Sequence, residues 1–341
     1  MKAAIYNPYL DTLGGGERYT MAVATTLLKN GYSVDVEWKD VDIKNKLEER
    51  FDIDLDKINF IPDVKRGDGY DLCFWVSDGS VPTLKARKNI LHFQVPFTNI
   101  SGTSLLNKFK LMRISKIVCN SNFTKNVIDK EFGVESVVLY PPVSVEKFKP
   151  KKKENIILNV ARFSSLMQSK RQDVLIETFK NFNQSNPGYK LILAGGVEIG
   201  AKDYVESLEK SVGDLSIEII KSPDFKTLKN LYGKAKIFWS AAGYETDEVK
   251  EPQKTEHFGI TVVEAMATGC VAIVCNTGGH KETIHNGVDG FLWNDTGELY
   301  GITKKILSEE KMRKTIFTNA IESAKRFSYK NFEEVFVKLC L

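Results

Sequence analysis

Two carboxylates with seven residues between them are the groups in this chain best placed to do chemistry. They lie in the segment EHFGITVVEAMATGC, where Glu264 falls inside an apolar helical pattern and Glu256 precedes it. The apolar side chains that flank Glu264 in the sequence offer it no hydrogen bond, and burying an unpaired carboxylate costs free energy. We therefore expect Glu264 to face a ligand. Glycines at 259 and 269 predict a tight turn, about three helical turns and a glycine C-cap.

Two cations could provide a second part of the same site. Arg162 and Lys170 follow the strand-like run NIILNVA. Ligands of open α/β sheets bind outside the carboxyl ends of strands, where an arginine fork and a lysine point charge suit a diphosphate. Arg171 could share or take the role of the lysine, and a solvated basic loop is the alternative interpretation.

The spacing of the two glutamates at the mouth of a βαβ unit resembles the signature of the retaining glycosyltransferases of family 4, which have the GT-B fold. The resemblance implies that Glu264 holds the ribose of a sugar nucleotide and that Glu256 lies beside the transferred sugar. It implies that Arg162 and Lys170 neutralise the leaving diphosphate. It also assigns donor contacts to Phe258, Gly259 and Ile260. The alternative is a structural glutamate paired with a nearby lysine.

The branch of the family is indicated by two further strings. The segment AGYETDEVKEPQKTEHFGITVVEAM and the string LYPPV resemble the branch that contains the lipid-linked oligosaccharide α-1,2-mannosyltransferases. This resemblance does not specify mannose. A GDP-sugar or a UDP-sugar is the expected co-substrate, with no separate cofactor.

Two features of the first half are weaker candidates. A glycine run ends in Gly15 and Gly16, between the first strand and the first helix, and would let backbone N–H groups approach a ligand. It lacks the GxGxxG spacing of a dinucleotide fingerprint, and a plain tight turn explains it equally well. The family resemblance implies that this loop closes on donor and acceptor. It also implies a catalytic position near the donor sugar for His92, for which a core histidine is the alternative.

The rest of the chain predicts the elements that hold these residues. Short apolar runs alternate with helical periods, as a parallel sheet covered by helices requires, so the fold class is α/β. The resemblance specifies the GT-B fold, with two Rossmann-like doubly wound domains facing across a cleft. The proline- and lysine-rich string YPPVSVEKFKPKKKEN predicts the linker. We expect an acceptor-side domain over 1–147 and a sugar-nucleotide-binding domain over 148–327. The last helix, about 328–341, should pack back on the first domain.

Composition excludes several classes of protein. The chain has 341 residues and a net charge of +4, which suits two domains and gives no argument for nucleic acid. Five cysteines without metal-ligand spacing predict reduced core thiols, and the absence of a long apolar run or signal peptide predicts a cytoplasmic protein. The Asp52, Asp54 and Asp56 run follows a charged stretch and predicts a solvated turn. No metal site is expected.

One surface feature suggests a partner. No acidic residue occurs between Asp78 and Asp129, and this stretch contains Lys108, Lys110 and Arg113 among apolar residues. A helix of this pattern could lie on anionic lipid at the cytoplasmic face of a membrane, which would make the protein peripheral. An amphipathic helix docked on its own domain is the alternative.

Together these features predict a metal-independent, retaining glycosyltransferase that moves a sugar from a nucleotide sugar to a glycan or lipid-linked acceptor. Cations at the diphosphate would bind the transition state more tightly than the ground state. The alternatives are a sugar-nucleotide epimerase of the same bilobal fold and a non-catalytic sugar-nucleotide-binding subunit. A nicotinamide-dependent oxidoreductase is disfavoured by the missing dinucleotide fingerprint.

Overall fold

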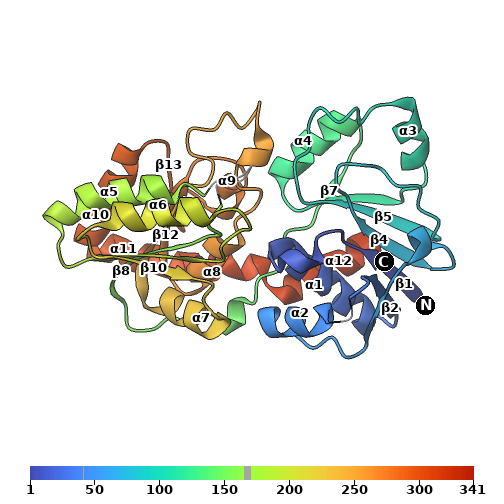
Figure 1. Cartoon of the computed structure of the whole chain (residues 1–341), viewed down its shortest axis with the longest axis horizontal. Coiled ribbons are helices and arrows are strands. Elements are labelled where there is room, and N and C mark those ends of the chain that lie inside the picture. The colour runs from blue at the N-terminus through green and yellow to red at the C-terminus, as the bar shows by residue number, and fades with distance from the viewer. Residues whose placement is uncertain (41, 165–169) are drawn as a thin grey trace. The chain divides into compact units, whose positions relative to one another are not determined.

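The computed structural model describes residues 1–40, 42–164 and 170–341. The chain forms two compact units (Figure 1). Unit 1 contains Met1–Pro142 and Tyr329–Leu341, and unit 2 contains Val143–Ser328. Each unit is built on its own parallel sheet.

Unit 1 is built on a sheet of seven parallel strands in the order β3-β2-β1-β4-β5-β6-β7. The strands are β1 (Lys2–Tyr6), β2 (Ser33–Glu37), β3 (Ile58–Ile61), β4 (Leu72–Val76), β5 (Lys88–Phe93), β6 (Lys116–Cys119) and β7 (Val137–Val138). The helices are α1 (Gly15–Lys29), α2 (Ile43–Phe51), α3 (Leu105–Leu111), α4 (Asn122–Phe132) and α12 (Tyr329–Cys340).

The C-terminal helix α12 is part of the core of unit 1. It lies beside α1, as the red and blue ribbons of Figure 1 show. Phe332 and Phe336 are buried in the core, and the Phe332 ring meets the Tyr19 ring edge-on at a centroid distance of 5.2 Å. At the surface, Lys29 and Glu333 form an ion pair of 2.7 Å. The last helix thus completes a core begun by the first residues of the chain.

Unit 2 is built on a sheet of six parallel strands in the order β10-β9-β8-β11-β12-β13. The strands are β8 (Glu154–Val160), β9 (Lys190–Gly195), β10 (Ile217–Lys221), β11 (Ala235–Ser240), β12 (Val271–Cys275) and β13 (Phe291–Trp293). The helices are α5 (Gln172–Ser185), α6 (Lys202–Val212), α7 (Phe225–Lys234), α8 (Ile260–Ala267), α9 (His280–Thr283), α10 (Thr296–Ser308) and α11 (Glu310–Ala324).

Both sheets follow the strand order of a doubly wound fold. The first strand of each unit lies inside its sheet, with the second strand on one side and the fourth on the other. The chain therefore adds its first strands on one side of β1 in unit 1, and of β8 in unit 2, and then crosses over to add the remaining strands on the other side. Such a switch point leaves a crevice at the carboxyl ends of the two central strands, where α/β proteins bind ligands. The expected α/β class and Rossmann-like strand order are confirmed.

The local signals around α8 set its length. The helix begins after Gly259, whose φ of 97° a residue with a side chain rarely adopts. It has 8 residues, fewer than the three turns predicted, because Thr268 leaves the helical conformation and Gly269 follows at a φ of 69°. The Cys270 N–H then closes the end by donating to the Ala265 carbonyl at 3.0 Å.

Two further findings concern the chain as a whole. Its five cysteines are all free and buried, as predicted. Among the residues that the structure describes, we find no helix that combines the length and the apolar character needed to span a bilayer.

Candidate functional site

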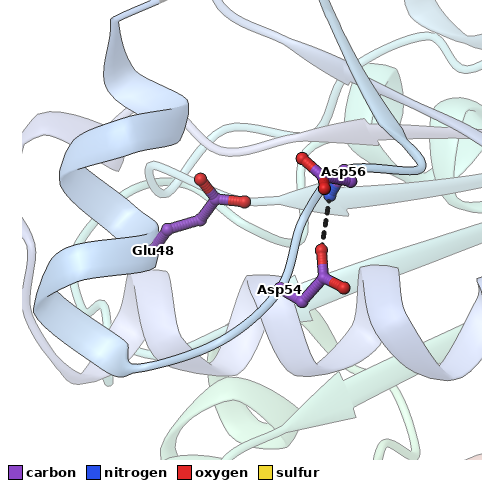
Figure 2. Close-up of side chains that lie close together, drawn as sticks. All are labelled: Glu48, Asp54 and Asp56. Carbon is purple, nitrogen blue, oxygen red and sulfur yellow. Dashed lines mark hydrogen bonds between the residues drawn. The ribbon is translucent and has the colours of Figure 1, made fainter.

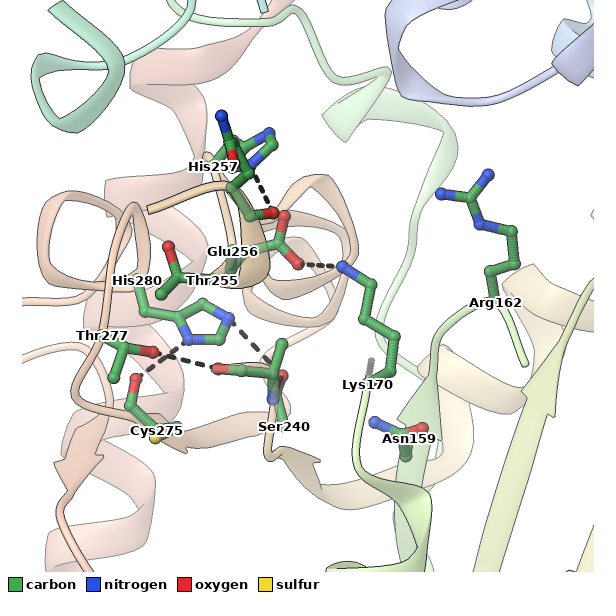
Figure 3. A network of polar contacts seen from close by, with 12 residues as sticks. Asn159, Arg162, Lys170, Ser240, Thr255, Glu256, His257, Cys275, Thr277 and His280 are labelled. Carbon is green, nitrogen blue, oxygen red and sulfur yellow. Dashed lines mark hydrogen bonds and ion pairs between the residues drawn. The ribbon is translucent and has the colours of Figure 1, made fainter. Parts of the chain in front are cut away.

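The candidate site of unit 2 gathers at the carboxyl ends of three adjacent strands. Arg162 follows β8, Glu256 lies on the long connection after β11, and His280 begins α9 after β12. Lys170 lies just before α5. Figure 3 shows these side chains around one end of the sheet. This is the edge at which a doubly wound sheet binds ligands.

An ion pair between Lys170 and Glu256 is the centre of this site. Lys170 Nζ lies 2.9 Å from Glu256 Oε2, and the two side chains are only 11% and 18% exposed. Burial raises the pKa of the Glu256 carboxyl, but the charge of Lys170 and its hydrogen bond outweigh this effect and bring the pKa to about 2. The Glu256 carboxyl is therefore ionised at neutral pH, beside the side chain of Lys170.

A pair of glycines positions Glu256. The Gly279 N–H donates to the Glu256 carbonyl at 2.7 Å. A Cβ at Gly278 would lie 2.2 Å from the Glu256 carbonyl oxygen, and one at Gly279 would lie 2.4 Å from the His257 carbonyl oxygen. Any other residue would force the two loops apart, so the glycines are required by close packing. The loop carrying Glu256 is thereby fixed against the loop after β12.

His280 is a site residue that the sequence analysis did not identify. It is fully buried, and its Nδ1 lies 2.9 Å from the Cys275 carbonyl, a contact that requires a proton on Nδ1. Its Nε2 lies 3.5 Å from Ser240 Oγ (Figure 3). Burial lowers the pKa of His280. The signal available in the sequence was the glycine pair directly before this histidine, at the end of an apolar strand.

Arg162 and Arg171 point to different partners. Arg162 is 46% exposed, and its Nη1 lies 3.5 Å from Glu198 Oε1. Arg171 donates to the Tyr244 carbonyl at 3.2 Å and to Glu245 Oε2 at 3.1 Å. Of the two adjacent cations, Lys170 rather than Arg171 meets Glu256. The connection between Arg162 and Lys170 includes 165–169, which lie outside the described residues.

Glu264 is buried, and its partner comes from another helix. The residue is 5% exposed, and the hydroxyl of Tyr232 on α7 donates a hydrogen bond to Glu264 Oε2 at 2.9 Å. This donor lies 32 residues away in sequence, so the neighbours of Glu264 gave no sign of it. Burial of the carboxylate alone therefore does not demand a ligand, and the ribose-binding role of Glu264 stays a prediction.

The three residues between the glutamates form the start of α8. Phe258 is buried and packs edge-on against Phe327 at a centroid distance of 5.1 Å. Its side chain thus belongs to the core of unit 2, and only its backbone could meet a donor. Gly259 turns the chain, and α8 begins at Ile260. The positive end of the helix dipole lies here, where it favours an anion.

The glycine run of unit 1 is held by the side chain of Glu17. The Gly14 N–H donates to Glu17 Oε2 at 2.7 Å, and Gly14 is the N-cap of α1. A Cβ on Gly16 would lie 2.0 Å from Gln94 Oε1. The Gln94 side chain is flexible and could move aside, so this contact alone does not require glycine, and the donor-binding role of the loop stays a prediction.

His92 lies in the core of unit 1. It is fully buried, and its ring stacks on Tyr19 at a centroid distance of 4.2 Å. Its Nδ1 lies 3.0 Å from the Val118 carbonyl, so that nitrogen carries the proton, and burial lowers the pKa of His92 to about 3. The side chain has no exposed surface for a substrate. This geometry corresponds to the core histidine that the sequence left open, and it does not support the expected catalytic role.

Helix α3 exposes its apolar residues. Four large apolar side chains, one of them Phe109 at 71% exposure, are exposed on this helix and the residue after it: Leu105, Leu106, Phe109 and Met112. Their spacing of three and four residues places them along one side of the helix. They do not dock on unit 1, whereas Leu111 and Ile114 pack against its core. The alternative of an apolar stripe docked on its own domain is therefore wrong for these four side chains.

The three cations on and after α3 differ in their exposure and in their contacts. Lys108 is exposed and Lys110 is partly exposed on α3. Arg113 follows the helix and donates its Nε–H to the Leu84 carbonyl at 2.9 Å. Membrane or acceptor contact by the three residues stays a prediction.

An acidic cluster in unit 1 is accounted for by its own hydrogen bonds. Carboxylate oxygens of Glu48, Asp54 and Asp56 lie within 4.8 Å of one another (Figure 2). Asp54 accepts from the Asp56 N–H at 2.9 Å, Glu48 accepts from the Leu55 N–H at 2.9 Å, and Lys44 pairs with Asp56 at 2.7 Å. These contacts describe a polar turn, as the sequence predicted for this run.

The chain is similar to proteins of one family. Residues 143–323 match the family model described as glycosyl transferases group 1. One relative is the GDP-Man:Man(3)GlcNAc(2)-PP-Dol alpha-1,2-mannosyltransferase of Dictyostelium discoideum, to which the chain is 31% identical over 236 residues. The aligned region covers 64% of this chain and 44% of that protein. The chain is 26% identical over 226 residues to the alpha-1,3/1,6-mannosyltransferase ALG2 of Kluyveromyces lactis, covering 56% and 43%. The chain thus spans about half the length of the curated relatives it matches.

Solved structures show the same fold. HepE of Anabaena in complex with UDP superposes with a TM-score of 0.79 and 18% identity, covering 99% of both chains. A sucrose-phosphate synthase of Thermosynechococcus elongatus gives a TM-score of 0.71 and 16% identity over 99% of this chain and 98% of that one. These likenesses establish the GT-B fold predicted from the sequence.

Proposed function

The chain belongs to the glycosyl transferases of group 1, and from this premise we propose that it is a metal-independent, retaining enzyme that transfers a sugar from a nucleoside diphosphate sugar. The observation that carries the proposal is the Lys170–Glu256 pair, buried at the switch-point edge of unit 2. Ligands of open α/β sheets bind at that edge. The pair presents an ammonium group at the place where a donor diphosphate would lie.

Charge neutralisation is the proposed chemistry. Breaking the bond at the anomeric carbon leaves negative charge on the diphosphate, which Lys170 and the half-exposed Arg162 would stabilise. The N-terminus of α8 would add its partial positive charge. Glu256, kept ionised by Lys170, would orient the transferred sugar or balance its developing positive charge. Two cations and a helix terminus would replace a divalent metal.

The nucleoside end of the donor would meet Glu264. A carboxylate accepts from two vicinal ribose hydroxyls, and Tyr232 fixes one of its oxygens. The names of the relatives suggest GDP-mannose as donor, whereas the UDP complex of HepE suggests that UDP also fits this fold. We therefore propose a GDP-sugar or a UDP-sugar as co-substrate.

A lipid-linked acceptor is the finer part of the proposal. The relative from Dictyostelium is named for a dolichol-diphosphate oligosaccharide. In this chain, the exposed apolar stripe of α3 stands beside Lys108 and Lys110, as expected of a helix that lies in an anionic lipid interface. We propose that the enzyme works at the cytoplasmic face of a membrane, on a glycan or lipid-linked saccharide.

The test begins with donor identity. Thermal unfolding with GDP, UDP, ADP, TDP and their sugars should single out one base, because a ligand at about 100 times its Kd stabilises by about 2.7 kcal/mol. The selected nucleotide sugar is then incubated with saccharide acceptors in the presence of the parent, Lys170→Gln and, as a matched control, Arg171→Gln. We expect transfer by the parent and the control and a large loss in Lys170→Gln.

The outcomes separate the alternatives. Conversion of the sugar nucleotide without an acceptor would identify an epimerase. Donor binding without transfer to any acceptor would identify a binding subunit. Binding of NADH instead of a nucleotide sugar would indicate an oxidoreductase.

A further inference from the structure

A pocket at the amino ends of two strands of the second sheet is rich in positive charge. It has a volume of about 260 Å³. We call it the basic pocket, and it is lined by Lys153, Lys236, Gly269, Arg313, Lys314 and Phe317. Lys153 directly precedes β8, and Lys236 is the second residue of β11. The pocket therefore lies at the amino ends of the strands whose carboxyl ends carry the Lys170–Glu256 pair.

Three of the four cations have no carboxylate partner among the residues that the structure describes. Lys236 donates to the Asn155 side chain, Lys153 lies 3.4 Å from the Tyr232 carbonyl, and Arg313 donates to main-chain carbonyls of 306 and 307. Lys314 alone pairs with an acid, the exposed Glu310, at 2.8 Å. The nearby Glu154 is already paired with Lys234 at 3.0 Å. The charge of the basic pocket is thus largely uncompensated.

The wall and floor of the basic pocket are built from α11 and the turn before β12. The Phe317 ring packs so closely on Gly269 that a Cβ there would lie 2.3 Å from the ring. Lys153 Nζ lies 5.9 Å from the centroid of the same ring. Burial lowers the pKa of Lys153, and burial together with the charge of Arg313 lowers the pKa of Lys236. Keeping these cations together costs free energy that a bound anion would recover.

We propose that the basic pocket binds a small phosphate-bearing anion, separate from the donor diphosphate site. Ammonium and guanidinium groups on several sides of a concave pocket provide the charge-assisted hydrogen bonds that phosphate oxygens accept. The pocket lies at the amino ends of β8 and β11, whereas Arg162, Lys170 and Glu256 lie beyond the carboxyl ends of the same two strands. The inference goes beyond the proposed transfer reaction and does not depend on it.

Isothermal titration with inorganic pyrophosphate at constant ionic strength tests this assignment. The Lys170→Gln variant serves as background, because it weakens binding at the donor edge and leaves the basic pocket intact. In that background we expect K236Q/K314Q to weaken pyrophosphate binding about tenfold or more, the size expected for loss of charge-assisted contacts. The charge-preserving K236R/K314R should retain binding.

A control pair distinguishes the pocket from general surface charge. Lys180 on α5 and Lys210 on α6 are exposed, and K180Q/K210Q removes the same charge. We expect this control to bind as the background does. Equal binding by K236Q/K314Q and the background, or an equal loss in the control pair, would overturn the proposal.

Discussion

Lys170 and Glu256 are 86 residues apart in sequence, yet they meet with Nζ 2.9 Å from Oε2 at the carboxyl edge of the second sheet. The pair joins the loop after β8 to the loop after β11. These two strands are neighbours in the sheet and lie on either side of the switch point. Its charges are largely shielded from water. Removing one member should therefore have consequences for stability as well as for donor binding.

The first prediction concerns the pH dependence of this pair. The pKa of Glu256 is lowered in the fold from 4.5 to about 2, so the unfolded chain binds the proton more readily. The pair should therefore stabilise the protein above about pH 4.5, by about 3 kcal/mol, and lose this effect as the pH falls toward 2. Urea unfolding of the parent and Glu256→Gln from pH 7 to pH 3 should show a difference that shrinks with acidity.

A double variant is the control for that measurement. Glu256→Gln leaves the Lys170 ammonium group without its carboxylate, whereas Lys170→Met/Glu256→Gln removes both charges. We expect the double variant to be more stable than the single one. A pH-independent difference between parent and Glu256→Gln would contradict the assignment.

The second prediction concerns Glu264 and its hydroxyl donor. Glu264→Gln should keep the fold but weaken nucleoside diphosphate binding about tenfold, because an amide accepts less strongly from ribose hydroxyls than a carboxylate does. Tyr232→Phe removes the 2.9 Å hydrogen bond and should weaken binding less. Titration calorimetry gives both values. If Glu264→Gln binds the nucleotide as the parent does, the carboxylate has a structural role only.

The third prediction is that transfer survives removal of metals. Lys170, Arg162 and the start of α8 would neutralise the diphosphate, so dialysis against EDTA should leave the rate of transfer unchanged. The double variant Asp54→Asn/Asp56→Asn should also be active, since those carboxylates serve a turn. Loss of activity that is restored by magnesium or manganese would contradict the proposed mechanism.

The fourth prediction concerns His92. Because its pKa falls from 6.5 to about 3 on folding, stability should decline as the pH drops below about 6.5, by up to about 1.4 kcal/mol per pH unit. His92→Phe keeps an aromatic ring against Tyr19 and removes the titrating group. Its unfolding free energy should therefore depend less on pH between 6.5 and 5. Retained transfer activity in this variant would support a core role, and loss of transfer without loss of stability would support a catalytic one.

The fifth prediction separates two contributions to membrane binding by α3. Replacing Lys108, Lys110 and Arg113 by glutamine should cost about 3 kcal/mol of attraction to anionic vesicles, roughly a hundredfold in partitioning at low salt. Leu105→Ser/Phe109→Ser should weaken binding at low and physiological salt alike, because burial of apolar surface is not screened. Sedimentation with vesicles measures both, and donor binding should not change. Equal partitioning of all three proteins, or none by the parent, would leave α3 as ordinary domain surface.

The fold could be predicted closely because local signals agreed with the global pattern. The apolar run NIILNVA marked β8 correctly, and the last helix expected at about 328–341 is α12. Strand β3 gives a weak signal, because its four residues include the polar Asn59 and it is a partly buried edge strand. Short edge strands carry too few buried positions to give a clear period.

The site was predicted less completely because its contacts are non-local. Sequence reasoning proposed Lys170 and Glu256 as separate groups, but their ion pair depends on the topology. The contacts of the Tyr232 hydroxyl and the His280 imidazole could not be predicted from the sequence for the same reason. The role of His92 stays a prediction, and its position at the end of a strand does not reveal that its buried ring stacks on Tyr19.

The contact of Gly278 and Gly279 with the loop of Glu256 has a consequence for how this enzyme can change. Because each glycine lies against a main-chain carbonyl, neither loop can shift unless the other shifts with it. A substitution that moves one of the two loops would therefore need a compensating substitution in the other. Directed evolution of donor preference should find its freedom elsewhere at this edge, for example at the half-exposed Arg162.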